Sequence, residues 1–176
     1  MNKDWNDLMN ENYWRDPWDV EPELDFQFVT KRLAVGGAIG TTKNMMALSV
    51  AGITHVVDMQ YEFDDRTIVA GGIQVLWIKC HDDFQPKAQE MFLEGVHFTL
   101  KALEDPSARV LFHCAQGIHR GPMMLLAVLR ALGHGKNRAR QAIRAVRPQA
   151  DFPPVYVASV EEFSVEWRAN SPMAVA

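Results

Sequence analysis

The sequence predicts a three-layer α/β domain with a mainly parallel central sheet. Short apolar segments that suit strands alternate along the chain with longer segments that suit helices, an order typical of parallel sheets covered by helices. One short segment, Val110–Phe112, is apolar at every position, as expected of a strand that is buried on both faces. The segment Met123–Leu129 is apolar on nearly every face of a helix, so this helix is expected in the interior.

Length and composition fit one cytoplasmic domain. The chain has 176 residues, 48% of them hydrophobic, which is enough for a sizeable core. No apolar segment is as long as a membrane span and the amino terminus does not resemble a secretory signal, so we expect no membrane contact. Two cysteines are too few for a disulfide framework and suit a reducing compartment. The net charge of −4 gives no argument for nucleic-acid binding, and the sequence does not indicate an oligomeric state.

Charge and aromatic content divide the chain into three parts. Residues 1–24 contain seven acidic residues, two basic residues and three tryptophans, whereas the rest of the chain is nearly neutral. Disordered segments seldom hold three tryptophans, so residues 1–24 are predicted to form an arm that packs its aromatic side chains on the domain. A docking segment for a partner, or a lid over the site, is the alternative. Residues 25–170 are the predicted domain and residues 171–176 a tail.

The first half of the domain is predicted to contain four strands and one short helix. We expect two strands joined by a turn in Leu24–Val35, a helix capped by Thr41 or Thr42 and ended by Gly52, and strands at Ile53–Met59 and Ile73–Lys79. The acidic segment 62–66 is expected to be the loop after the third strand.

The second half is predicted to contain the central strand and four helices. The helices are expected at Pro86–Leu103, from Pro122 to Gly133, from Lys136 to Arg147, and from Pro153 onward. The third of these helices has a basic face that is expected to point mostly outward, formed by Lys136, Arg138, Arg140, Arg144 and Arg147. Such a face is usually solvated, although it could attract an acidic substrate or the arm.

The stretch that carries chemistry lies between the predicted central strand and the buried helix after it. The backbone N–H groups of this turn have no helical or sheet partner, so they can converge on one point at the positive end of the helix. A cradle of this kind binds an oxyanion. The predicted phosphate-binding residues are Ala115, Gln116, Gly117, Ile118, His119 and Arg120.

Two side chains complete the predicted site. Cys114 lies at the edge of the cradle, where the positive field favours the thiolate, the nucleophilic form of cysteine. Arg120 offers a planar fork of donors that can hold two oxygens of a phosphate. A nucleophilic sulfur is therefore expected to face a phosphate-shaped socket.

Other interpretations of the two cysteines are less favourable. A structural core cysteine needs neither a loop of converging donors nor an arginine after it. A zinc site made from residues 80–81 and 113–114 is disfavoured, because neighbouring strand residues point to opposite faces and neither pair could easily supply two ligands. Reversible pairing of Cys80 with Cys114 is a third alternative, since a reactive thiol is also an oxidation target. We therefore expect no metal and no cofactor in the reaction.

The pattern His-Cys-x-x-Gly-x-x-Arg at residues 113–120 resembles the signature of the cysteine-dependent protein tyrosine phosphatases, and its surroundings resemble their dual-specificity branch. The similarity continues through Arg32–Gly37 and Gly52–Val57 and extends from about residue 26 to about residue 165. It implies about five strands flanked by helices, with the cysteine loop at the carboxyl edge of the central strand. The chain departs from the family at Gly121, where a Ser or Thr hydroxyl usually helps the sulfur leave.

The resemblance implies covalent catalysis in two steps. Cys114 attacks phosphorus while an aspartate protonates the leaving oxygen, and water then releases phosphate. Asp82 is the expected general acid, because it follows the predicted strand Ile73–Lys79 and lies 32 residues before Cys114. Asp83 is the alternative, and both could instead be loop acids that cap the next helix. His113 is expected to orient the loop and to hydrogen-bond the thiolate.

The predicted function is that of a phosphoric monoester hydrolase, namely a dual-specificity protein phosphatase whose partner is a phosphorylated protein substrate. Two alternatives remain. The first is a slow or inactive phosphate-binding module of the same fold, which Gly121 and the aromatic arm favour. The second is a phosphatase of nucleotide or RNA ends, phosphoinositides or sugar phosphates, since these present the same dianion. The loop has no lysine, which gives little support to a multiply phosphorylated inositol.

Overall fold

The computed structural model describes residues 23–170 of the chain. The predicted tail, and the predicted arm except for Glu23 and Leu24, lie outside these residues and stay predictions. Between residues 23 and 170, no helix is long and apolar enough to cross a membrane.

The described residues form one five-stranded sheet in the order β1-β2-β5-β3-β4. β1 pairs antiparallel with β2, and the other neighbouring pairs are parallel. The strands are β1 (Phe26–Phe28), β2 (Leu33–Gly36), β3 (His55–Asp58), β4 (Gln74–Trp77) and β5 (Val110–His113). The predicted mainly parallel sheet is therefore confirmed, and β5 is its central strand.

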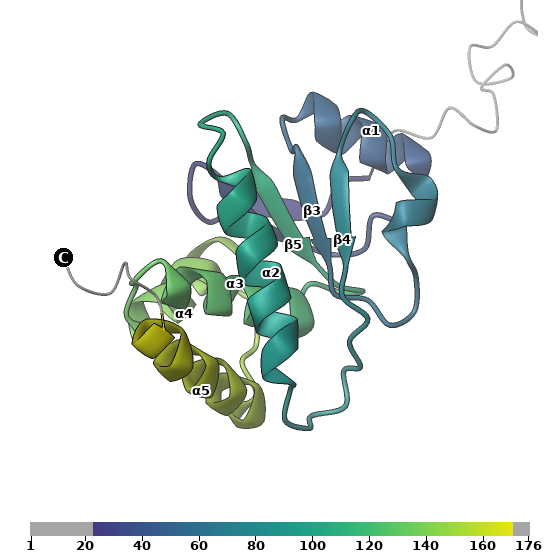
Figure 1. The fold of residues 1–176 in the computed structure, drawn as a ribbon. Coiled ribbons are helices and arrows are strands. Elements are labelled where there is room, and N and C mark those ends of the chain that lie inside the picture. Colours follow the sequence, from purple (N-terminus) through teal and green to yellow (C-terminus); the bar gives the residue numbers. More distant parts are fainter. Residues whose placement is uncertain (1–22, 171–176) are drawn as a thin grey trace, which may run out of the picture.

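Helices cover both faces of this sheet (Figure 1). The short helix α1 (Thr42–Val50) and the 3₁₀ helix η2 (Asp65–Ile68) pack on one face through a shared hydrophobic cluster. The larger layer on the other face contains α2 (Gln89–Ala102), α3 (Arg120–Ala131), α4 (Lys136–Val146) and α5 (Pro154–Asn170). The three layers that the sequence predicts are thus present.

The side chains of β5 alternate between two hydrophobic clusters. Leu111 packs with Met45 and Leu48 of α1 on one face of the sheet. Val110 and Phe112 point to the other face and pack with the residues of α2 and α3. All three apolar side chains of β5 are buried, which confirms the prediction of a strand covered on both faces.

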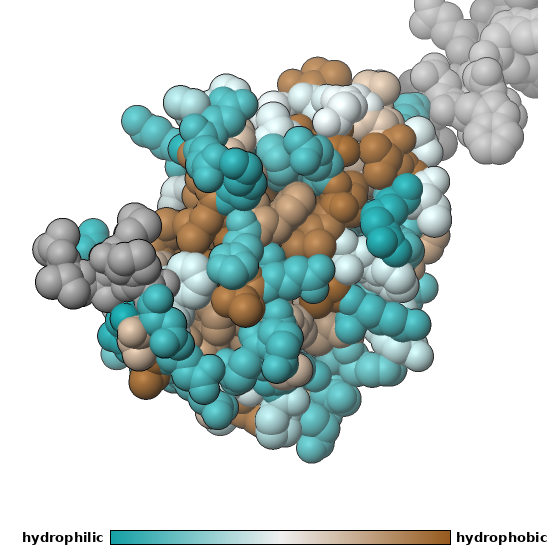
Figure 2. Space-filling view, viewed as in Figure 1, coloured by the Kyte–Doolittle hydropathy of each residue, from teal (hydrophilic) through white to brown (hydrophobic). Residues whose placement is uncertain are grey.

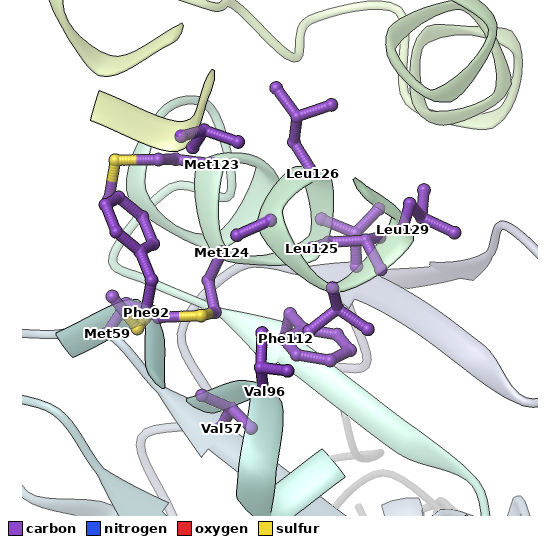
Figure 3. Close-up of a cluster of buried hydrophobic side chains, with 14 of the residues drawn as sticks. Val57, Met59, Phe92, Val96, Phe112, Met123, Met124, Leu125, Leu126 and Leu129 are labelled. Atoms are coloured by element: carbon purple, nitrogen blue, oxygen red, sulfur yellow. The ribbon is translucent and has the colours of Figure 1, made fainter. Parts of the chain in front are cut away.

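The helix α3 is buried along most of its length, because residues 120–129 are all buried. Figure 3 shows Met123 of α3 beside Phe92 of α2, and Met124 and Leu125 on the side of α3 that faces Val96 of α2 and Phe112 of β5. Leu126 points away from these residues, on the opposite side of the helix. Since α3 begins at Arg120, this packing holds the end of the cysteine loop against the sheet.

Local signals at α1 behave as the sequence predicts. Thr41 is the N-cap, and its side-chain oxygen accepts a hydrogen bond from the backbone N–H of Asn44 at 3.1 Å. Gly52 follows the helix with a φ of +91°, a conformation that suits glycine. These two residues set the length of α1 and therefore where β3 begins.

The parallel strands β2, β3, β4 and β5 all end at the same edge of the sheet, so the segments after them gather there. These segments contain Gly37, Glu62, Asp82 and Cys114, respectively. A separate cavity of about 900 Å³ lies between α2, α3 and α5, at the opposite end of α3 from Cys114. In Figure 2, which views α2 and α5 from outside, hydrophobic residues are visible between hydrophilic ones on this side of the molecule.

Candidate active site

The cysteine loop, Cys114–Arg120, joins β5 to α3 and has an ordered pattern of backbone hydrogen bonds. The carbonyl groups of residues 115–119 all accept hydrogen bonds of 2.7 to 3.1 Å, from the backbone N–H groups of Ala38, Met123 and Asp151 and from the side chain of Arg147. In contrast, the N–H groups of residues 115–120 have no hydrogen-bond partner within residues 23–170. The loop thus keeps a set of free donors, as an oxyanion cradle requires.

Arg147 fixes this shape with all five N–H bonds of its guanidinium. Nε donates to the carbonyl of Gly117 at 2.7 Å, and Nη2 donates to that of Gln116 at 2.8 Å. The remaining donors bind Asp25 Oδ1 at 2.8 Å, Asp25 Oδ2 at 2.7 Å and Gln27 Oε1 at 2.8 Å. Arg147 is 1% exposed, so these bonds form away from bulk water.

The prediction that Arg147 points outward with the other basic residues was wrong. Lys136, Arg138 and Arg144 are exposed as expected, but Arg147 is the C-cap of α4, with φ −131° and ψ 79°. Because it is no longer helical, its side chain leaves the periodic face. Its hydrogen bonds hold the pKa of Asp25 below the usual value, so this carboxylate neutralises the buried guanidinium.

Gly117 is required by the same contact. Its φ is +62°, and a Cβ atom at this position would lie 2.4 Å from Nη2 of Arg147 and 2.4 Å from the carbonyl oxygen of Gly36. A side chain at residue 117 would therefore displace either the arginine or β2.

The guanidinium of Arg120 is held by the segments that follow β3 and β4. Nη1 donates to the carbonyl groups of Cys80 at 2.9 Å and Met59 at 3.3 Å, and Nη1 and Nη2 bind the two oxygens of Glu62 at 2.9 and 3.0 Å. The side chain is 3% exposed, yet its Nε has no hydrogen-bond partner within the described part of the chain. Since buried donors are seldom left unpaired, this Nε is available to a phosphate oxygen.

The structure places Asp82 beside the cysteine loop. Asp82 Oδ2 lies 3.0 Å from Nδ1 of His119 and 3.7 Å from Nε of Arg120, while Oδ1 accepts a hydrogen bond of 3.0 Å from the hydroxyl of Tyr156. Burial raises the pKa of Tyr156 to about 12, and its hydrogen bond to Asp82 acts in the same direction, so this hydroxyl is a donor at neutral pH. Two side chains that the sequence did not single out for chemistry, Tyr156 and Glu62, therefore position Asp82 and Arg120.

Asp83, the alternative general acid, lies outside this group. Its carboxylate is paired with Lys87, and its side chain is 45% exposed. The hydrogen bond from Lys87 holds the pKa of Asp83 below its usual value, which disfavours the protonated form that a general acid needs. The ion pair and the exposed position of Asp83 therefore both disfavour it as the general acid.

His113 does not make the contact that the sequence suggested. Its Nε2 faces Asp65 and Asp58, at 2.9 and 3.6 Å, and neither ring nitrogen has a hydrogen-bond partner among the described residues. The prediction that His113 hydrogen-bonds the thiolate of Cys114 is therefore wrong. The reason is strand geometry, since adjacent residues of an extended segment direct their side chains to opposite sides.

Both cysteines are free, and both are buried in the larger hydrophobic cluster, with Cys80 4% and Cys114 2% exposed. Cys80 packs in the core, where burial raises its pKa to about 11. Cys114 begins the loop and lies close enough to Arg120 for their charges to interact. Lys87 and Arg120 also lower the pKa of Cys80, but burial outweighs them. Cys114 differs in its place at the start of the loop, next to the free N–H groups of residues 115–120.

Comparison with known proteins gives partial matches. No family model matches the chain. Dual specificity protein phosphatase 26 from Bos taurus is 33% identical over 89 residues, which cover 49% of this chain and 42% of that protein. The protein of the same name from Homo sapiens is 31% identical over 94 residues, covering 52% and 44%. The chain therefore spans less than half the length of the curated relatives it matches.

Solved structures share the fold at lower identity. A mouse putative dual specificity phosphatase, complexed with zinc tungstate, has a TM-score of 0.72 and 22% identity, covering 85% of this chain and 92% of that structure. PTPMT1 in complex with PI(5)P has a TM-score of 0.72 and 20% identity, covering 82% and 97%. The chain therefore has the fold of these solved structures. The partial sequence matches bear out the resemblance seen in the sequence: over about half of its length the chain is similar to dual-specificity phosphatases.

Replacing Arg147 with lysine should loosen the cysteine loop while keeping the positive charge. Lysine cannot make five directed hydrogen bonds, so we expect a loss of about 3 kcal/mol in the free energy of unfolding. We also expect about tenfold weaker binding of inorganic phosphate, because the N–H groups no longer converge. Urea unfolding and calorimetry measure the two effects. Arg138→Lys, an exposed change on the same helix, is the control; equal behaviour of both variants would show that the loop holds its shape unaided.

The pH dependence of this stability difference has a defined sign. The pKa of Asp25 is lowered in the folded state by Arg147. The stabilisation from Asp25 is therefore fully present above its unfolded-state pKa of about 3.9, and is lost as the pH falls through the lower folded-state value. Lowering the pH should consequently reduce the difference in the free energy of unfolding between wild type and Arg147→Lys.

Alkylation with iodoacetamide at pH 7 should label Cys114 and spare Cys80. With a pKa of about 11, Cys80 is ionised in only about one molecule in 10⁴ at this pH. Peptide mass spectrometry measures both rates, and inorganic phosphate should slow the labelling of Cys114 alone. Equal labelling of the two cysteines would contradict the assignment of Cys114 as the reactive thiol.

Proposed function

We propose that this protein is a cysteine-dependent phosphoric monoester hydrolase that dephosphorylates tyrosine and serine or threonine residues of proteins through a phosphocysteine intermediate. One observation carries the proposal. The N–H groups of residues 115–120 are free while the neighbouring carbonyl groups are all engaged, beside a cysteine and an arginine with an unpaired Nε. The relation to dual-specificity phosphatases supports the same reaction.

In the first step, the thiolate of Cys114 forms a bond to phosphorus as the bond from phosphorus to the ester oxygen breaks. The loop N–H groups and Arg120 hold the three equatorial oxygens, where negative charge accumulates. Asp82 gives its proton to the leaving oxygen, which departs as an alcohol or phenol. Tyr156 and His119 hold the two oxygens of this carboxyl group in place.

In the second step, a water molecule replaces the sulfur. Asp82, now ionised, takes a proton from the water as its oxygen attacks phosphorus, and the bond from phosphorus to sulfur breaks. Inorganic phosphate leaves, and Cys114 returns to the thiolate. No metal takes part in either step.

Exposed aromatic side chains next to this site favour a phosphorylated side chain of a protein as substrate. Phe84 is 52% exposed and its ring contacts His119 edge-on, with 5.2 Å between centroids. Tyr61 is 42% exposed and stacks on His81 at 3.5 Å. Phe84 has a φ of +55°, an uncommon value for a residue other than glycine. This conformation is stabilised by a hydrogen bond from the backbone N–H of Phe84 to the hydroxyl of Tyr156. These rings offer apolar surface to an aryl leaving group and to flanking peptide residues.

A phosphoinositide is the second candidate substrate. It is favoured by the structural similarity to PTPMT1, which was solved in complex with PI(5)P. The variable positions of the cysteine loop contain no lysine to attract additional phosphate groups. Comparing kcat/KM for phosphopeptides and for phosphatidylinositol phosphates distinguishes the two candidates, and we expect the peptides to be preferred.

Hydrolysis of a small aryl phosphate tests the mechanism. Cys114→Ser should abolish turnover, because the hydroxyl of serine is far less ionised and less nucleophilic. Asp82→Asn should lower kcat about 10²- to 10³-fold for a poor leaving group and much less for a good one, since only the former needs protonation.

Asp83→Asn is the matched control for Asp82→Asn, because the two carboxylates are adjacent but only Asp82 faces the loop. Its rate should stay within about twofold of wild type. Turnover by Cys114→Ser would remove the covalent mechanism, and a larger loss in Asp83→Asn than in Asp82→Asn would reassign the general acid.

Gly121 allows a separate test of the second step. A Cβ atom at residue 121 would lie 3.1 Å from Cα and from the carbonyl carbon of His113, so any side chain there pushes α3 away from β5. Without a hydroxyl beside the sulfur, wild type should show a burst of product followed by slow turnover. Gly121→Ser should speed the slow phase while costing about 1–2 kcal/mol of stability.

Gly121→Ala separates the two effects, since it adds the same Cβ atom without the hydroxyl. It should lose similar stability and keep the slow phase. Stopped-flow kinetics and thermal unfolding give the comparison. No burst in wild type, together with equal rates in Gly121→Ser and Gly121→Ala, would show that breakdown of the phosphoenzyme does not limit turnover.

A further inference from the structure

Three fully buried side chains that the proposed reaction does not use face one another next to the cysteine loop. Asp58 ends β3, Asp65 begins η2 and His113 ends β5, and each is 0% exposed. One ligand atom from each lies within 4.8 Å of the other two. Across residues 23–170, no other three His, Cys, Asp or Glu side chains come this close together.

The contacts of the His113 ring with the two carboxylates are not hydrogen bonds. His113 Nε2 lies 2.9 Å from Asp65 Oδ2, yet neither atom has a hydrogen-bond partner within the described residues, so the N–H bond of the ring is not directed at that oxygen. Asp65 Oδ1 is also unpaired. The distance from Nε2 to Asp58 Oδ1 is 3.6 Å. Buried polar atoms are nearly always hydrogen-bonded or bound to an ion. We therefore expect the ring of His113 and the carboxylate of Asp65 to share a binding partner.

The charges of the three side chains indicate that this partner is positively charged. Two buried carboxylates face a single imidazole, which contributes at most one positive charge. Arg66, the next residue along the chain, is mostly exposed and is paired with Asp64. The negative charge of the two ionised carboxylates is thus not fully balanced by the protein, and a bound cation would balance it.

We propose that Asp58, Asp65 and His113 bind one divalent transition-metal ion, with Zn²⁺ as the best fit, inside the domain. Each residue supplies one donor, namely His113 Nε2, Asp58 Oδ1 and Asp65 Oδ2, and the fourth position is left for a water molecule. Tetrahedral ligands at zinc bond lengths lie about 3.3 Å apart. The observed 2.9 and 3.6 Å differ from this by a few tenths of an ångström.

The surroundings of Asp58 are those of a metal ligand held in place. Its Oδ1 accepts the backbone N–H of Gln60 at 2.8 Å, and its Oδ2 accepts that of Asp65 at 3.1 Å. These bonds orient the carboxylate without using all its lone pairs. The ion is structural: it ties β3, η2 and β5 together immediately before Cys114, and it takes no part in phosphoryl transfer. The inference does not depend on the proposed function.

Because the site is closed to solvent, metal should enter during folding, and the test starts from unfolded protein. The full chain is unfolded with a chelator, refolded with or without Zn²⁺, dialysed and analysed by plasma mass spectrometry. Wild type refolded with Zn²⁺ should retain about one ion per chain and unfold at least about 5 °C higher than the metal-free protein.

Two variants identify the ligands. Asp65→Asn should retain less than about a tenth of an ion and show no thermal shift, whereas Asp64→Asn, its exposed neighbour, should behave as wild type. Cys114→Ser should keep the ion, which excludes a zinc bound by the reactive sulfur. If Asp65→Asn does not refold, X-ray absorption of the wild-type zinc protein replaces it, and should show nitrogen and oxygen ligands without sulfur.

The proposal is overturned if wild type refolded with Zn²⁺ retains no ion and shows no thermal shift. It is equally overturned if Cys114→Ser loses the ion, if Asp65→Asn keeps it, or if sulfur is among the ligands. None of these results bears on catalysis, because hydrolysis of the aryl phosphate is measured separately.

Discussion

The site depends on the bond between Arg147 and the carbonyl groups of the cysteine loop. A loop that presents several N–H groups to one point must turn its carbonyl groups the other way, and those need donors of their own. Arg147 supplies two of these bonds from a rigid plane, and its remaining donors are fixed by Asp25 and Gln27. The anion cradle is therefore held open from behind by a buried cation.

Two buried arginines among the described residues are each paired with a carboxylate, but their roles differ. Each of the two buried arginines is held by a carboxylate from a distant segment, Arg147 by Asp25 and Arg120 by Glu62. All donors of Arg147 are used within the protein, so it is confined to a supporting role. Arg120 keeps Nε unpaired, so it can act on a ligand. Saturation of the hydrogen bonds separates the supporting arginine from the working one.

Features that depend on local sequence were predictable. The alternation of strands and helices gave the layers, and the loop from Cys114 to Arg120 was evident from residues adjacent in the chain. Contacts between distant segments were not. Asp25 and Arg147 are 122 residues apart, so no periodicity connects them. The position of Arg147 directly before Pro148, where a helix must end, was the available sign that it would leave the helical face. The contact of His113 was predicted wrongly because the side chains of adjacent strand residues point to opposite sides, so His113 faces Asp58 and Asp65 and not the sulfur of Cys114.

The ion pair between Asp25 and Arg147 also links the beginning of the domain to its centre. Asp25 lies just ahead of the edge strand β1, and through Arg147 it is one side chain away from the backbone of Gly117. A recombinant fragment that starts at Phe26 would retain every residue of the cysteine loop. It would still lose Asp25, the carboxylate that holds Arg147 against the carbonyl groups of the loop. A fragment of this domain should therefore begin upstream of Asp25.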